Sequence, residues 1–287
     1  MRLVTFYKDG QATCGVRRGD SIVDLSRAAP DLPDTWPAIF AANALEAVAH
    51  AAESAPDSAL VPAADARLLV PIPHPPKILA IGLNYRSHAE EAGLAIPDYP
   101  IVFPRWPTSL VGHDAALVRP AASTDFDHEA ELLVVIGTGG RHIAKAKALD
   151  HVAGYSVFND GSLRDYQFKS SQWAMGKNFD ASGSWGPDIV TADELPPGAA
   201  GLRIQARIDG EVRQDGDTGD MIFDVATLIA ALSEVMTLEP GDIIPTGTPP
   251  GVGFARKPPL WMHPGEVCEI EIEKIGILRN PIVAETA

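Results

Sequence analysis

The chain has 287 residues, of which 46% are hydrophobic and 7% aromatic, so it is long enough to bury the core of a globular protein. Its 38 acidic residues outnumber 23 Lys and Arg residues, and the formal net charge of −15 argues against nucleic acid or an anionic membrane as the main partner. The N-terminus lacks the apolar stretch of a signal peptide and no run is long enough to span a bilayer, so we expect a cytoplasmic protein that does not bind membranes.

Residues 1–70 have the pattern of a small N-terminal domain. The alternating segments "MRLVTFY" and "SIVDL" predict strands, and the Ala-rich stretch "PAIFAANALEAVAHAAESA" has the apolar spacing of a helix. The proline-rich segment that follows indicates an extended connection leading into a strand at residues 77–81. We therefore place a boundary near residue 70 and a second domain over residues 71–287.

Residues 71–287 contain many short β-like segments separated by Gly, Pro and Asp turns, with few clear helices. The clearest helix, over residues 221–238, carries its apolar side chains along one stripe, which indicates core or a subunit contact. This pattern predicts a mixed, β-rich α+β fold and not a doubly wound one. The strand candidates are "LLVVIG", "AGYSVFND", "RIQARIDG", "GDIIPTG" and "EVCEIEIEKIG".

The segment "GLNYRSHAEEAG" (82–93) predicts a short helix. Ser87 and Glu90 have the spacing of a capping box, and Gly93 marks a stop, so the helix should start at His88. His88 and Glu91 then lie on one helical face, where the carboxylate could orient the imidazole and raise its basicity for general-base work. The same spacing also occurs in exposed pairs on surface helices.

Two glutamates stand two positions apart in "FDHEAELLVVIG" (126–137). On a strand Glu129 and Glu131 point to the same face, with Asp127 before them, so their carboxylates could converge. Carboxylates held that close require either that one of them takes up a proton or that a cation lies between them, and oxygen ligands suit a hard divalent ion. An exposed strand face is the alternative explanation for the pattern.

In "GYSVFNDGSLRDYQ" (154–167), Asp160 follows a predicted strand and precedes a helix that Ser162 and Asp165 would cap. Asp160 is therefore a candidate third metal carboxylate, or else a turn residue. Arg164 and Gln167 lie one helical turn apart and could hold a carboxylate and a carbonyl oxygen side by side. Arg164 could equally pair with an acidic neighbour.

Two later segments could also contribute to a site. Lys177 lies in "AMGKNFDASGSWGP", a stretch without apolar periodicity where a cation could face a ligand or remain at the surface. The loop of "GDIIPTGTPPGVG" places Thr246 and Thr248 near backbone N–H groups, which suits a carboxylate-binding nest or a plain turn. It is not a Walker loop, because the Gly-Lys-Ser/Thr ending is missing.

Taken together and in this order, "HEAELLVVIG", "NDGSLRDYQ", "GKNFD" and "GDIIPTGTPPGVG" resemble the fumarylacetoacetate hydrolase family, over roughly residues 70–287. The resemblance implies a β-sandwich or β-roll catalytic domain and usually a homodimer. It implies that Glu129, Glu131 and Asp160 bind one divalent cation, Mg²⁺ or Mn²⁺, with Ca²⁺ as a further candidate. It also implies that His88 and Glu91 belong to a lid. The positions that match the family's substrate pocket are Arg164, Gln167, Lys177 and Thr248.

The chain departs from the family pattern next to these positions. Gly161 and Leu163 replace the Val and Ala of many relatives, and "ASGSWGP" stands where "GFAPLGP" is frequent. These changes bear on substrate identity more than on the type of reaction. Tyr85, Ser184 and Trp185 are the candidate specificity residues.

The combined pattern predicts a metal-dependent hydrolase that cleaves a C–C bond in an acylpyruvate-like β-diketo acid. Three protein oxygens leave room on an octahedral ion for a 2-oxo acid and a water. Lys177 would stabilise the developing enolate, His88 would activate the water, and Gln167 would donate to the oxyanion. Decarboxylation or isomerisation of a 2-oxo dioate fits the same residues, and a non-catalytic ligand-binding protein is a further alternative.

Overall fold

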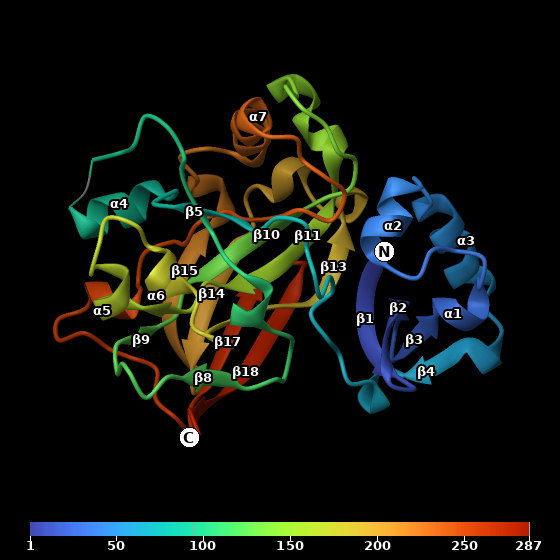
Figure 1. Cartoon of the computed structure of the whole chain (residues 1–287), viewed down its shortest axis with the longest axis horizontal. Helices are drawn as coiled ribbons and strands as arrows, with labels where there is room; N and C mark the ends of the chain where they lie inside the picture. The colour runs from blue at the N-terminus through green and yellow to red at the C-terminus, as the bar shows by residue number, and fades with distance from the viewer. Residues whose placement is uncertain (94, 287) are drawn as a thin grey trace.

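The structure is a computed structural model that describes residues 1–93 and 95–286, and most of its regular elements are strands (Figure 1). The strands are β1 (Arg2–Lys8), β2 (Gln11–Arg18), β3 (Ser21–Asp24), β4 (Leu60–Pro62), β5 (Leu79–Gly82), β6 (Ile101–Pro104), β7 (Leu110–Val111), β8 (Leu117–Arg119), β9 (Phe126–Asp127), β10 (Ala130–Ile136), β11 (Val152–Asn159), β12 (Ser162–Leu163), β13 (Gly183–Thr191), β14 (Arg203–Ile208), β15 (Glu211–Asp217), β16 (Ile243–Pro245), β17 (Val267–Ile272) and β18 (Gly276–Ala284). The helices are α1 (Leu25–Ala28), α2 (Trp36–Ala41), α3 (Leu45–Ser54), α4 (Arg86–Ala92), α5 (Arg164–Gln167), α6 (Ala174–Lys177) and α7 (Val225–Val235).

Two large sheets carry the fold. The main sheet runs in the order β16-β10-β11-β13-β1-β2-β3-β4, with β7 parallel to β13, and the second runs β15-β14-β17-β18-β8. Strand β10 contacts β14, and β11 contacts β17 and β18, so the sheets pack against each other. This is the mixed, β-rich α+β fold that the sequence predicts.

Strand β10 is buried on both faces, which explains its unbroken apolar run. Leu132 and Val134 belong to the core between the two sheets, whereas Leu133 and Val135 pack in the cluster that includes Trp36 of α2. Because side chains alternate along a strand, Glu129 and Glu131 share the face of Leu133 and Val135. The two glutamates therefore point into the protein and not into solvent, and the exposed-face alternative is wrong.

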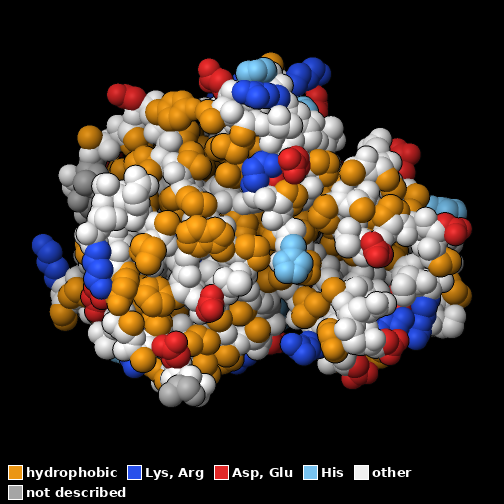
Figure 2. Space-filling model, in the orientation of Figure 1, with side chains coloured by type: hydrophobic (Ala, Val, Ile, Leu, Met, Phe, Trp, Pro, Cys, Tyr) orange, Lys and Arg blue, Asp and Glu red, His pale blue; other side chains and the backbone are white. Residues whose placement is uncertain are grey.

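The N-terminal strands extend the main sheet. Strand β1 pairs with β13 through Arg2↔Val190 and Leu3↔Ile189, and β2, β3 and β4 follow outward. The elements α1, α2 and α3 lie beside these strands as the blue lobe of Figure 1. Figure 2 shows this lobe next to a larger body, across which apolar side chains are spread with few charges between them. The boundary near residue 70 stays a prediction.

Two predicted helices differ from the structure. The Ala-rich stretch forms α2 and α3 and not one helix, because Asn43 between them takes a left-handed backbone conformation with φ of 52°. The helix expected over residues 221–238 is only α7, because the side chain of Asp224 accepts the backbone N–H of Thr227 and caps the helix there.

All five quoted strand segments form strands, namely β10, β11, β14, β16 and β17. Among the longer strands, the sequence patterns do not predict β2, β13, β15 and β18. Among residues 1–93 and 95–286, no helix is both long enough and apolar enough to cross a membrane.

Candidate metal centre and active site

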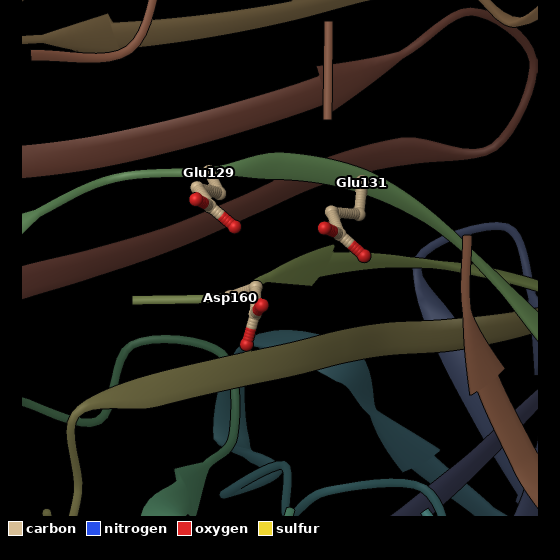
Figure 3. Close-up of side chains that lie close together, drawn as sticks. All are labelled: Glu129, Glu131 and Asp160. Atoms are coloured by element: carbon tan, nitrogen blue, oxygen red, sulfur yellow. The ribbon is translucent and has the colours of Figure 1, made fainter. Parts of the chain in front are cut away.

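Three carboxylates converge at one end of β10 and β11 (Figure 3). Glu129 immediately precedes β10, Glu131 lies within it, and Asp160 follows β11. The antiparallel pair Ala130↔Asn159 brings the two strands into register at this point. One oxygen of each carboxylate lies within 4.8 Å of the others, and all three side chains are buried. The sequence-predicted metal ligands therefore form one cluster.

The electrostatics of the cluster fit a divalent cation. Burial, followed by repulsion from Asp160 and Glu129, raises the pKa of Glu131 well above its ordinary value. The backbone N–H of Gly247, 3.0 Å from a Glu131 oxygen, offsets only part of this effect. A hard cation held by three carboxylate oxygens would remove the repulsion, as such ions prefer oxygen ligands.

Lys177, the last residue of α6, carries a positive charge into the cluster. Its Nζ lies 2.6 Å from an oxygen of Glu129 and 2.6 Å from an oxygen of Asp160, and the side chain is 2% exposed. Burial by itself raises the pKa of Glu129, but the charges of Lys177 and Arg164 outweigh it, so the net shift is downward. Lys177 is thus a buried residue of the site and not a surface lysine.

Arg164, the first residue of α5, has one nitrogen left for a ligand. Its Nε donates to Asp127 at 2.8 Å, and its Nη1 lies 2.7 Å from Glu129 and 2.8 Å from Gln167 Oε1. Its Nη2 is buried and has no hydrogen-bond partner in the described part of the chain. Since Gln167 Oε1 accepts from Arg164, the amide nitrogen of Gln167 stays available as a donor.

Arg105 is a residue of the site that sequence reasoning missed. Its Nη1 lies 2.5 Å from Asp160 Oδ1, its Nη2 donates to Ser182, and its Nε donates to Ser109. The guanidinium is fully buried, and it holds the Asp160 oxygen that Lys177 does not. Arg105 follows β6 and is far from Asp160 in the sequence. The contact between them therefore leaves no local sequence motif.

Asp127 anchors a loop instead of joining the metal ligands. One of its oxygens accepts the backbone N–H of Gly253 at 2.7 Å, and the other accepts that of Phe254 at 2.9 Å as well as Arg164 Nε. Burial alone raises the pKa of Asp127, but Arg164 leads the charges and hydrogen bonds that outweigh it, so the pKa falls. The alternation of Asp127 with Glu129 and Glu131 in the sequence predicts that this carboxylate lies near the other two. It does not predict that Asp127 anchors a loop.

Helix α4 carries the predicted dyad. His88 Nδ1 lies 3.2 Å from Glu91 Oε2, and the two side chains are 15% and 29% exposed. The carboxylate of Glu91 also accepts the backbone N–H of Gly251, at 3.0 and 3.1 Å to its two oxygens. Glu91 therefore connects the imidazole to the Gly-rich loop, and the pair is more than an exposed surface contact.

Both predicted capping boxes are wrong. Helix α4 starts at Arg86, with Tyr85 as an N-cap that makes no side-chain bond, because the Ser87 hydroxyl and N–H both go to Asp220. The stop at Gly93 is confirmed, since Gly93 adopts a left-handed conformation with φ of 65°.

Helix α5 also lacks a side-chain cap. The Ser162 hydroxyl donates to the backbone oxygen of Asp160, and Asp165 accepts from the hydroxyl of Ser123. In both helices a longer-range or backbone contact takes the side chain that the local spacing assigned to the cap.

The Gly/Pro loop after β16 contributes a backbone group to the carboxylate cluster. Between Thr246 and Thr248, the N–H of Gly247 faces Glu131, so the nest binds a protein carboxylate. The hydroxyl of Thr248 donates to the backbone oxygen of Ala130 and accepts from Gln214. Thr248 lines the cavity with this hydroxyl already engaged.

An open cavity of about 740 Å³ adjoins the cluster. Seven predicted residues line it: His88, Glu91, Glu129, Arg164, Gln167, Lys177 and Thr248. The predicted specificity residues Tyr85, Ser184 and Trp185 are fully buried and are not among the described residues that line the cavity. Ser184 donates to Asn280 and Trp185 packs in the core, so the structure corrects their expected position at the substrate.

Comparisons with known proteins show the family to which the chain belongs. Residues 77–283 match the family profile described as "Fumarylacetoacetate (FAA) hydrolase C-terminal". The chain is 38% identical over 268 residues to the human oxaloacetate tautomerase FAHD2A, mitochondrial, covering 92% of this chain and 85% of that protein.

Two solved structures illustrate the shared fold. A fumarylacetoacetate hydrolase from the psychrophile Exiguobacterium antarcticum matches with a TM-score of 0.87 at 35% identity, over 99% of this chain and all of that one. A maleylpyruvate hydrolase from Sphingobium sp. SYK-6, in complex with manganese(II) and pyruvate, matches with a TM-score of 0.82 at 30% identity over the whole of both chains. The protein belongs to the fumarylacetoacetate hydrolase family, a family of enzymes.

Proposed function

We propose that this protein is a metal-dependent hydrolase that cleaves a C–C bond in a β-diketo acid of the acylpyruvate type. The observation that carries the proposal is the His88–Glu91 pair, which lines the same cavity as Glu129 and Lys177. An imidazole that is oriented by a carboxylate is suited to take a proton from a water molecule.

The residues around the carboxylate cluster divide the remaining work. A divalent cation, Mg²⁺ or Mn²⁺, would be held by Glu129, Glu131 and Asp160 and would supply Lewis-acid polarisation of the 2-oxo acid. The unpartnered Nη2 of Arg164 suits the substrate carboxylate, and the free amide of Gln167 suits the oxyanion at the attacked carbonyl. Lys177 stabilises the negative charge that develops on the departing enolate.

A second candidate function is enol–keto tautomerisation of a 2-oxo dioate. The name of the human relative, an oxaloacetate tautomerase, favours it. This reaction needs a group that moves a proton but no attacking water, and His88 with Lys177 could move a proton between carbon and oxygen. Decarboxylation of the same substrate class requires only stabilisation of the enolate.

Proton NMR of the purified protein with acetylpyruvate, and separately with oxaloacetate, tests the proposal. Each substrate is incubated with Mg²⁺ and with excess chelator. Acetate and pyruvate formed from acetylpyruvate only when Mg²⁺ is present is the expected result. Intact acetylpyruvate together with faster enol–keto exchange of oxaloacetate would make the protein a tautomerase, and pyruvate from oxaloacetate would make it a decarboxylase.

The homodimer and the cytoplasmic location stay predictions. A sedimentation experiment on the purified protein measures the first, and fractionation of the source cells measures the second.

A further inference from the structure

The cavity is larger and more apolar than a 2-oxo acid needs. The 2-oxo acid end has six non-hydrogen atoms, which fill about 180 Å³ if each takes roughly the 30 Å³ of a water molecule. The cavity measures about 740 Å³, so most of it lies beyond the carboxylate cluster. Leucine, isoleucine and aromatic side chains line it at seven positions: Ile81, Leu83, Ile101, Phe103, Phe168, Trp173 and Phe254.

The aromatic wall begins at the charged groups. Phe103 is 6% exposed, and the Nζ of Lys177 lies 5.3 Å from the centre of its ring. The guanidinium carbon of Arg164 lies 5.8 Å from the centre of the Phe254 ring. A substrate whose acidic end meets Lys177 and Arg164 therefore places its other end next to aromatic rings.

The inner part of the wall is closely packed. Trp173 stands edge-on to Phe103, with ring centres 5.6 Å apart, and its ring lies against the backbone of Gly82 in β5. A Cβ at Gly82 would come within 2.0 Å of this ring, so glycine at this position provides the space for it. Trp173 immediately precedes α6, the helix that carries Lys177. The wall and the catalytic ammonium thus share one support.

The outer part of the wall is open to solvent. Phe168 and Phe254 pack together with ring centres 5.1 Å apart, although 53% and 46% of their surfaces are exposed. Large rings left exposed at the mouth of a cavity are typical of ligand sites, where the ligand covers them.

We propose that the substrate carries a bulky apolar acyl group, such as an aromatic ring, which binds in the cavity between Phe103, Trp173 and Phe168. The proposal rests on the proposed function, because it assigns the acyl half of the same β-diketo acid. The charge on Lys257 favours a different substrate, one with an acidic acyl group. Lys257 also lines the cavity, and it has no ion-pair partner within residues 1–93 and 95–286. An acidic acyl group would use Lys257 in place of the rings.

Three substrates with different acyl groups test the proposal: benzoylpyruvate, acetylpyruvate and fumarylpyruvate, each assayed with Mg²⁺ by the loss of enol absorbance. We expect kcat/KM for benzoylpyruvate to exceed that for acetylpyruvate about tenfold or more, as expected when apolar groups fill a hydrophobic pocket. Equal values for these two would overturn the proposal. A preference for fumarylpyruvate would also overturn it and would assign the distal end to Lys257.

Variants locate the effect. Phe168→Ala should lower kcat/KM for benzoylpyruvate about tenfold more than it lowers kcat/KM for acetylpyruvate, since only the larger substrate reaches the ring. Phe168 is half exposed, so the variant is expected to fold. Tyr7→Ala is the matched control, because Tyr7 is an aromatic residue of β1 that is 47% exposed and is not among the residues lining the cavity. An equal decrease in kcat/KM for both substrates in Phe168→Ala would contradict the assignment.

Binding without turnover separates this inference from the proposed hydrolysis. Calorimetric titration with phenylpyruvate and with pyruvate, both in Mg²⁺, should show about tenfold tighter binding of phenylpyruvate. If this difference holds and no diketo acid is cleaved, the apolar site stands and the hydrolase proposal fails. If diketo acids are cleaved and the two ligands bind equally, the hydrolase proposal stands and the apolar site fails.

Discussion

At the scale of single residues, each charged group of the site has a defined neighbour. Lys177 connects Glu129 to Asp160, Arg164 connects Asp127 to Glu129, and Arg105 holds the free oxygen of Asp160. A buried charge is strongly destabilising unless an opposite charge lies next to it. Removing one member of a pair therefore leaves its partner buried and unpaired. Three predictions follow from particular side chains.

The first concerns the proposed general base. His88→Ala should lower C–C hydrolysis about 10²–10⁴-fold, the usual contribution of a positioned base. Mg²⁺ binding, measured by calorimetry, should not change, because the hydrogen bond of the imidazole goes to Glu91 and not to the carboxylate cluster. His50→Ala, at an exposed position on α3, is the control. Retained hydrolysis in His88→Ala would show that water is activated by another group.

The second concerns Glu131 and pH. Because its folded pKa is raised, the native metal-free protein binds this proton more tightly than the unfolded chain does. Stability then falls as the pH rises from the ordinary value of 4.5 through the raised pKa. Glu131→Gln cannot ionise, so in chelator its stability should not show this fall and should exceed that of the wild type at pH 8.

Thermal unfolding at pH 5 and pH 8, with chelator and with Mg²⁺, measures this effect. Mg²⁺ should stabilise the wild type more at pH 8 than at pH 5, since the ion replaces the proton on Glu131. Glu131→Gln should lose most of the stabilisation by Mg²⁺. The same pH dependence in both proteins would mean that Glu131 does not hold the proton.

The third concerns Arg105. Arg105→Met leaves the buried carboxylate of Asp160 without its guanidinium, which should cost about 3–5 kcal/mol of unfolding free energy. Arg105→Lys keeps the positive charge but loses the guanidinium nitrogens that donate to Ser109 and Ser182. Its unfolding free energy should therefore lie between those of the wild type and Arg105→Met. Urea unfolding measures the loss. Arg203→Met, which breaks an exposed pair with Asp215, should change stability little.

Much of the site could be predicted from the sequence, because its residues lie in short segments with local signals. The pattern Glu-x-Glu, the strand-end Asp160 and Lys177 are local in this sense, and the structure brings them together. The contact of Arg105 with Asp160 joins two residues 55 positions apart in the sequence, which no local pattern reports. The departure from the family pattern at Ser184 and Trp185 makes them candidate specificity residues, but both side chains on β13 are fully buried.

At the scale of elements, α4 is the segment that positions the dyad. It is tied at its first turn by Ser87 to Asp220 and at its last turn by Glu91 to the N–H of Gly251. The rest of the helix lies at the edge of the larger body, with α5 and α6 on the same side (Figure 1). These two contacts hold α4 near both of its ends.

Asp220→Ala should loosen α4 alone. The lost bonds resemble an N-cap, so local stability should drop by about 0.5–2 kcal/mol while global unfolding changes less. Hydrogen exchange should become faster over residues 86–91, and KM should rise more than kcat falls. Asp224→Ala, which removes the cap of α7, should speed exchange in α7 and not in α4. Faster exchange throughout the chain in Asp220→Ala would contradict a local role.

Strands were easier to predict than helix boundaries. The run in β10 and the alternation in β17 are hydrophobic patterns that burial imposes directly. Strand β15, with the sequence "EVRQDGD", is largely exposed and polar and carries no such pattern, so it was not predicted. Helix ends depend on single contacts, such as that of Ser87 with Asp220, and these are set by the tertiary structure.

At the scale of the whole molecule, the N-terminal residues share a core with the catalytic sheet. Trp36 and Ile39 of α2 pack in the same cluster as Leu133 of β10 and Trp185 of β13. The buried carboxylate of Asp188 in β13 binds Arg2 and Arg17 across the junction. The residues before position 70 thus cover one face of the sheet that carries the metal ligands.

Deletion of residues 1–70 should therefore prevent stable folding of the remainder. Without β1 the edge of β13 loses its pairing partner, and the apolar face of the sheet becomes exposed. Expression of residues 71–287, followed by circular dichroism and thermal unfolding, measures this. A cooperative transition with wild-type activity would instead show that the second domain folds on its own.

The pairing of buried charges has a consequence for the order in which ligands bind. The carboxylates are Asp127, Glu129, Glu131 and Asp160, and the cations are Arg105, Arg164 and Lys177. One negative charge is left over, and in the metal-free protein a proton on Glu131, whose pKa is raised, would balance it. When a divalent ion replaces this proton, the site carries one net positive charge. A singly charged 2-oxo acid then makes the site neutral. Metal and substrate should therefore each bind more tightly when the other is present, through charge balance alone.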